Sequence, residues 1–92
     1  MIFRTFQAHH GILVTCAWDA THQTFYTRGI SRHGRTLWED ASGMPTMLLL
    51  RAALLGHRIA LPGQEVEHLL HDRNTAAHHA SGSASLPRNG CP

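Results

Sequence analysis

The chain has 92 residues, of which 42% are hydrophobic, and its formal net charge is +2 at pH 7. This length allows one small domain with a modest core, so we expect a partner or a second copy to cover surplus apolar surface. All eight basic residues are arginines scattered along the chain, unlike the basic stripe of a typical nucleic-acid-binding domain.

No cationic segment followed by an apolar stretch opens the chain, so the sequence predicts no signal peptide. The longest apolar run covers residues 44–55 and is interrupted by Arg51. It is shorter than the roughly 20 residues that cross a bilayer. We therefore expect a cytoplasmic protein with no membrane partner. The two cysteines, Cys16 and Cys91, are too few for a disulfide framework.

The first part of the chain predicts four short β-strands, at residues 2–7, 12–18, 23–30 and 36–38. The two central runs are separated only by a polar break, in which Asp19 can accept hydrogen bonds from backbone N–H groups. The other two connections contain Gly11 and Gly34, and glycine suits tight turns because it adopts positive φ at no steric cost. We expect a four-stranded antiparallel meander.

A first helix is predicted over residues 47–55, ending at Gly56. Its start has two interpretations: either Pro45 occupies the first helical position, or Thr46 caps the helix from outside. The helix is apolar nearly all round, and Arg51 is its only charge. Because a surface helix normally has one apolar stripe, we expect its remaining face to pack against another chain or a second helix.

A second, amphipathic helix is predicted over residues 63–73, entered through Pro62. One face is expected to pack and the other to be solvated. The packing face consists of Val66, Leu69, Leu70 and Arg73. The solvated side consists of Glu67, His68, His71 and Asp72.

The last part of the chain, residues 74–92, is rich in Ala, Ser, Gly and Pro. It has too little apolar surface to offset its ordering entropy, and we expect it to be disordered. The predicted fold is thus α+β: a four-stranded antiparallel β-meander followed by two short helices packed on one face. Residues 1–73 form the single domain, and residues 74–92 form the tail.

The best candidate for a metal site is the pair His68 and His71, whose spacing of three residues places both imidazoles on one helix face. A stable site usually needs three or four protein ligands, and this pair lies opposite the apolar stripe, where solvated histidines are normal. Metal binding is therefore a lesser alternative, and we expect no cofactor.

We expect no enzymatic activity and no catalytic residue. The sequence contains no H-E-x-x-H motif, no glycine-rich phosphate loop and no G-x-S-x-G motif. Cys16 would need a neighbouring base or cation to act as a nucleophile. It shares a predicted strand face with Val14 and Trp18, so we interpret it as a small buried hydrophobic residue.

Three arginines, Arg28, Arg32 and Arg35, lie close together around one predicted turn. Guanidinium groups are suited to bidentate contacts with phosphate, and neighbouring aromatic side chains could stack single-stranded bases. The same aromatic residues are those that the core of a small meander would use. Nucleic-acid binding through these arginines is therefore an alternative function and not the favoured one.

Several short patterns between residues 10 and 73 carry a resemblance to other small proteins. They are Trp18-Asp19 after an apolar strand, Thr24-Phe25-Tyr26, Pro45-Thr46 and Leu61-Pro62. In these patterns the chain resembles a family of small uncharacterised proteins borne on proteobacterial plasmids and integrative elements. The resemblance implies a bacterial mobile-element accessory protein and assigns no activity to any residue. The tail departs from the family's pattern.

The favoured function is a non-enzymatic interaction or regulatory module that acts through protein–protein contacts as a homodimer. A host protein or an element-encoded protein is a further possible partner. We expect the interface on the first helix or at an edge strand. The predicted interaction residues of that helix are Met47, Leu50, Arg51 and Leu54.

Overall fold

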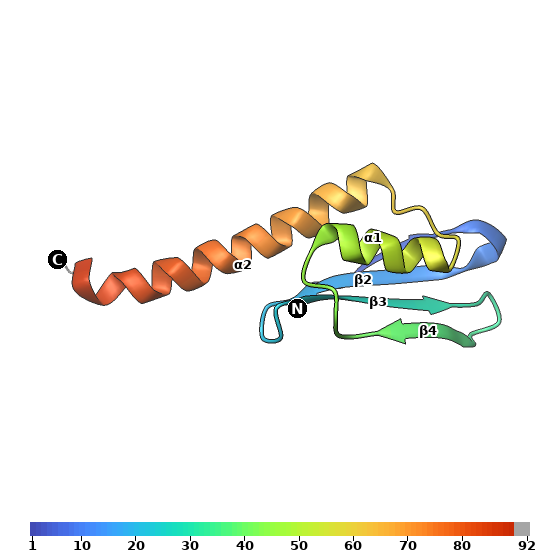
Figure 1. Cartoon of the computed structure of the whole chain (residues 1–92), viewed down its shortest axis with the longest axis horizontal. Coiled ribbons are helices and arrows are strands. Elements are labelled where there is room, and N and C mark those ends of the chain that lie inside the picture. Colours follow the sequence, from blue (N-terminus) through green and yellow to red (C-terminus); the bar gives the residue numbers. More distant parts are fainter. Residues whose placement is uncertain (90–92) are drawn as a thin grey trace.

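In the computed structural model, the backbone is described for residues 1–89 and the side chains for residues 1–77. Four strands follow one another in one antiparallel sheet of order β1-β2-β3-β4 (Figure 1). This confirms the predicted meander. The strands are β1 (Arg4–Gln7), β2 (Leu13–Asp19), β3 (Thr24–Ile30) and β4 (Thr36–Asp40).

The turns use the residues that the sequence singled out. Asp19 Oδ1 accepts hydrogen bonds from the backbone N–H groups of Thr21 and His22, at 3.0 and 3.2 Å. Between β3 and β4, Gly34 has a φ of 86°, a value that suits glycine because it has no Cβ. A short 3-10 turn, η1 (His9–Gly11), joins β1 to β2.

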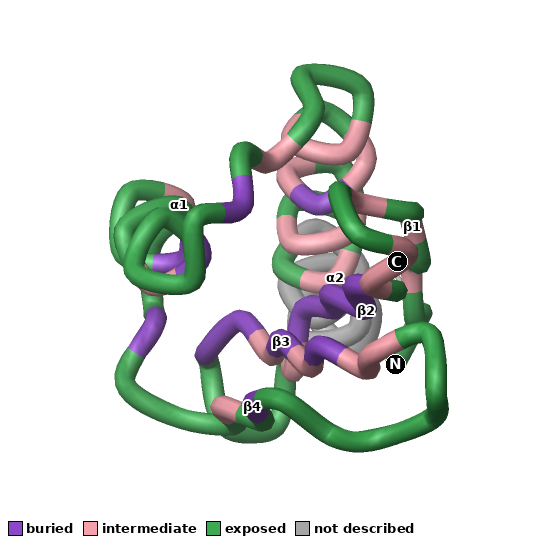
Figure 2. Tube along the Cα trace, turned by 90° about the vertical axis from the view of Figure 1, so that its right-hand side faces the viewer, coloured by how far each residue is buried: buried purple, intermediate pink, exposed green. Residues whose placement is uncertain are grey.

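Both helices lie on the same face of the sheet (Figure 2). Helix α1 (Met47–Gly56) packs over β3, and helix α2 (Gly63–Asn89) packs over β2. The start of α1 is decided by a side chain: Thr46 Oγ1 accepts a hydrogen bond from the backbone N–H of Leu49 at 3.3 Å. Thr46 is therefore the N-cap and Pro45 lies outside the helix.

Helix α2 does not end at Arg73, where the sequence predicted its C-terminus. Residues 74–77 continue the helix without a break. The rest of the predicted disordered tail lies outside the residues whose side chains are described, and its disorder stays a prediction. One correction follows for the second helix: Asp72 faces the sheet, because it pairs with Arg4 of β1.

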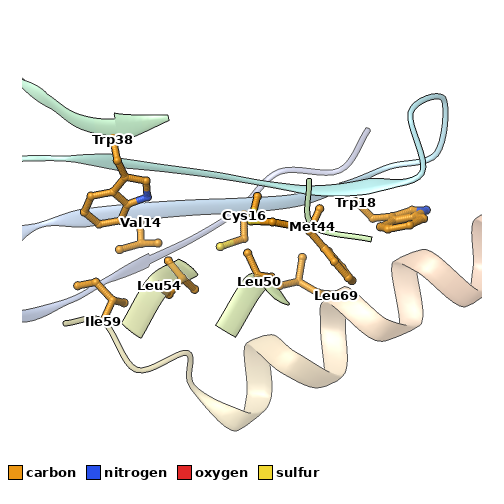
Figure 3. Packing of buried hydrophobic residues seen from close by; sticks show 10 residues of the cluster. Val14, Cys16, Trp18, Trp38, Met44, Leu50, Leu54, Ile59 and Leu69 are labelled. Atoms are coloured by element: carbon orange, nitrogen blue, oxygen red, sulfur yellow. The ribbon is translucent and has the colours of Figure 1, made fainter. Parts of the chain in front are cut away.

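The core fills the space between the sheet and the two helices. Figure 3 shows Val14 and Cys16 pointing from β2 toward Leu54 and Leu50 of α1. Fully burying one large apolar side chain contributes about 1.5–3 kcal/mol. The largest fully buried side chains are Phe25, Leu50, Leu54, Ile59, Leu69 and Val14.

Candidate functional site

The candidate site is the face of the sheet that the helices leave uncovered, which we call the open face. Cross-strand register determines which residues lie there. Arg28 of β3 pairs with Thr15 of β2 on one side and with Glu39 of β4 on the other, and Thr15 pairs with Thr5 of β1. Because cross-strand partners share a face, these four side chains form one row across the middle of the sheet.

Aromatic and hydroxyl groups surround this row. The Tyr26 hydroxyl donates a hydrogen bond to Glu39 Oε2 at 2.7 Å, and the Phe3 ring meets the Tyr26 ring edge-on, with centroids 5.8 Å apart. The Thr5 and Thr15 hydroxyls lie 3.2 Å apart. Burial raises the pKa of Tyr26, and the hydrogen bond to Glu39 raises it further.

The hydrogen-bonding groups of the charged pair in this row, Arg28 and Glu39, are incompletely satisfied. Arg28 Nε is buried and has no hydrogen-bond partner among the described residues. No ion pair joins Arg28 to Glu39 within residues 1–77, although the two are direct cross-strand partners. A buried, unpartnered donor is costly, and most such donors in native proteins find a partner.

The open face is also apolar around its centre. Phe3 is 58% exposed and Leu13 is 46% exposed, while Ile30 beside Leu13 is half-buried. A hollow of about 510 Å³ lies on this face. Its lining consists of Met1, Phe3, Thr5, Thr15, Tyr26, Arg28 and Glu39.

The interaction residues predicted on the first helix lie differently from the expectation. Leu50 and Leu54 are fully buried inside the chain, and Met47 packs partly against the same core. They cannot form an exposed contact surface. The exposed leucines of α1 are instead Leu48, Leu49 and Leu55, and Arg51 is exposed beside them.

The three arginines of the alternative nucleic-acid site fall in two places. Arg28 lies within β3 on the open face, where it is half-buried. Arg32 and Arg35 are exposed in the connection between β3 and β4. The Arg32 side chain packs against Gly11 of η1, which comes from a different connection of the sheet.

The histidine pair on α2 has no third ligand in the part of the chain that the structure describes. His68 is half-buried and His71 is exposed, and no group of three potential ligands lies together among those residues. His71 Nε2 lies 3.4 Å from the Thr75 hydroxyl in the next helical turn. Asp72 follows His71 directly, but its carboxylate accepts two hydrogen bonds of 2.7 Å from the Arg4 guanidinium.

Cys16 lies in the core with its thiol donating to Thr27 Oγ1 at 3.5 Å. Burial raises the pKa of this thiol to about 11. The thiolate is the reactive form of cysteine, so the environment of Cys16 keeps it in the unreactive form. This agrees with the interpretation of Cys16 as a buried hydrophobic residue.

Sequence reasoning missed the open face and also a cleft of about 750 Å³ between the N-terminus, the β2–β3 turn and α2. Trp18 and the Arg4–Asp72 pair contribute to its walls. The cleft brings together residues 68 positions apart, which no local pattern indicates. One sequence pattern could have indicated the open face. Polar residues alternate with core residues along the strands, and they are Thr5, Thr15, Arg28 and Glu39.

Comparison with protein-family models, with curated proteins and with solved structures found no match to this chain. The resemblance to mobile-element proteins therefore stays a prediction. Among the described residues, neither helix combines the length and the hydropathy that a membrane crossing needs.

Proposed function

We propose that the protein is a non-enzymatic interaction module that pairs with a second copy of itself through the open face. The observation that supports this most strongly is the juxtaposition of Arg28 on β3 and Glu39 on the edge strand β4, on a face that also exposes Phe3 and Leu13. The two groups carry opposite charges and sit side by side, so the surface is complementary to its own copy.

A simple symmetry operation brings the charges together. A two-fold axis that runs parallel to the strands, between β3 and β4, places each Arg28 opposite the partner's Glu39. In such an isologous contact every pair occurs twice. The terminal N–H groups of the Arg28 guanidinium, whose Nε is buried, would then gain a carboxylate acceptor, while Glu39 would keep its hydrogen bond from Tyr26.

The area over which the two copies touch limits how stable the dimer can be. With the axis between β3 and β4, only these two strands of each copy face each other. At about 4.8 Å between strands and about 3.3 Å per residue, this overlap measures roughly 10 Å by 20 Å. Stable interfaces bury about 800 Å² per partner, and this overlap is smaller. We therefore expect a dimer whose population rises steeply with protein concentration.

Helix α1 offers a competing surface for the second copy. Leu48 is 76% exposed and Leu55, seven residues later, is 63% exposed on the same side of the helix. However, α1 has only 10 residues, and the only charge near this stripe is Arg51, which an identical helix could not neutralise. The open face has matched charges, so we place the contact there.

The experiment exchanges the two charges in separate chains. Arg28→Glu places two carboxylates opposite two carboxylates in the homodimer, and Glu39→Arg places arginines opposite arginines. We expect each variant alone to dimerise about tenfold more weakly or worse, because like charges in close contact are costly. A mixture of the two variants should restore the dimer, because each interface pair is then oppositely charged.

Sedimentation velocity at several concentrations measures both homodimers and the mixture. The mixing step separates an effect between chains from an effect within one chain, since a fold damaged by its own substitution is not repaired by mixing. Leu48→Gln is the matched control on α1 and should leave the dimer unchanged. A dimer that survives both charge variants, or that is lost with Leu48→Gln, would refute the open-face contact.

A further inference from the structure

Three connections that are far apart in sequence meet at one end of the sheet. They are η1 between β1 and β2, the turn between β3 and β4, and the residues directly after α1 (Figure 1). His9 Nε2 lies 2.9 Å from the Arg58 carbonyl oxygen, which joins the first connection to the third. The Arg32 side chain packs on Gly11, which joins the first to the second.

A stacked pair fixes the third connection onto the sheet. The rings of Trp38 and His57 lie nearly parallel, with an interplanar angle of 9° and centroids 4.2 Å apart. Arg58 follows with a φ of 63°, and His10 in η1 has a φ of 58°. At Arg58 this value belongs to the end of α1: the backbone N–H of Ile59 donates to the Leu54 carbonyl oxygen at 2.9 Å, as in the usual C-terminal cap of a helix.

This end of the molecule is basic. It exposes arginine and histidine side chains from all three connections, and none of the three contains a carboxylate. We call it the basic end. It consists of Arg32, Arg35, Arg58, His9, His10, His33 and His57.

We propose that the basic end binds the phosphodiester backbone of nucleic acid. Arginine donates two parallel hydrogen bonds to phosphate oxygens, and an imidazole N–H can donate a further one. Because the arginines come from turns and not from a helix or strand that could enter a groove, the contact would be with the backbone and would carry no sequence preference. This activity goes beyond pairing of the chain with itself and uses other residues.

An anionic lipid surface presents the same phosphate chemistry, but the surroundings favour nucleic acid. Surface-binding segments pair basic residues with exposed apolar side chains that enter the bilayer. None of the exposed large apolar residues lies within the three connections. The exposed leucines closest in sequence to these connections are Leu13 on β2, Leu37 on β4 and Leu55 on α1, each on a different element.

The test measures binding of the full chain to a fluorescent 20-nucleotide single strand and to a 20-base-pair duplex over a range of salt concentrations. Three phosphate contacts predict a slope of log K against log salt near −3 for the duplex. Arg32→Gln together with Arg58→Gln should weaken binding about tenfold at low salt and reduce that slope by about two.

The matched control is Arg51→Gln together with Arg73→Gln, which removes the same net charge from the two helices. It should retain most of the binding. Equal weakening by both double variants would show that only overall charge matters and would overturn the site. Binding to vesicles containing anionic lipid, without binding to either oligonucleotide, would also overturn it. Circular dichroism of each variant checks that the fold is intact.

Discussion

The six-membered ring of Trp38 occupies the space in which a side chain at Gly29 would begin. The two residues are cross-strand partners on β3 and β4. The ring is fixed there by two further contacts: its Nε1 donates to Thr27 Oγ1 at 3.3 Å, and its face stacks on His57. Gly29 is thus required by close packing and not by backbone conformation, since an aromatic ring covers the strand at this point.

Gly29→Ala is therefore expected to destabilise the protein. A Cβ would overlap the Trp38 ring and force it away from Thr27 and His57, and overpacking of this kind costs about 1–3 kcal/mol. Urea unfolding followed by tryptophan fluorescence measures the loss. Gly56→Ala is the control, because its Cβ would meet no atom within 4 Å. An unchanged free energy of unfolding for Gly29→Ala would mean that Thr27 and His57 do not fix the Trp38 ring in this position.

Leu50 and Leu48 make a matched pair of positions on α1. Leu50 is fully buried, while Leu48 is 76% exposed. Leu50→Ala should lower the free energy of unfolding by about 2–5 kcal/mol, because it leaves a cavity in the core. Leu48→Ala should change it by about 0.5 kcal/mol or less. Chemical denaturation of both variants tests which side of α1 faces the sheet, and equal effects would contradict the packing described here.

The single tyrosine allows a direct measurement of its ionisation. Burial and the hydrogen bond to Glu39 favour the neutral phenol, so the pKa of Tyr26 lies above the ordinary tyrosine value. The associated stabilisation is complete below that ordinary value and is lost as the pH rises through the folded pKa. Absorbance at 295 nm should show a raised midpoint, and Glu39→Gln should lower it. A midpoint at the ordinary value would contradict this environment.

Cys16 should resist modification in the folded protein. With Cys91 replaced by serine, only one thiol remains, and burial raises its pKa to about 11. We expect negligible reaction with a thiol reagent at pH 8 and full reaction in urea, because the thiolate is scarce and the side chain is covered. Rapid labelling without denaturant would show that the strand opens or that the thiol is accessible.

The sequence alone determined the meander, the turns and the start of the second helix, and it left two interpretations for the start of the first. These features depend on residues that are neighbours along the chain. The Asp19 carboxylate accepts hydrogen bonds from the backbone N–H groups of Thr21 and His22, and Gly34 adopts a positive φ where the chain reverses. Such local chemistry acts before any distant segment is in place, so a pattern in the sequence is sufficient to predict it.

The sequence could not decide which side of a uniformly apolar helix is buried. Met47 to Leu55 offers leucines in nearly every direction, and periodicity gives no preference when almost every position is apolar. Only packing against Val14 and Ile59 selects Leu50 and Leu54 for the core and leaves Leu48 and Leu55 outside. Two of the four predicted contact residues, Leu50 and Leu54, lie on the buried side for that reason.

Tertiary structure alone also assembled the surfaces on which the proposals rest. Arg28 and Glu39 lie side by side because β3 and β4 pair in one register, and Arg58 contacts His9 of η1 because the chain after α1 returns to the sheet. The Arg4–Asp72 pair links positions 68 residues apart. Contacts between residues so far apart in sequence form only when complete helices and strands pack together. That packing depends on the whole core and not on any short stretch of sequence.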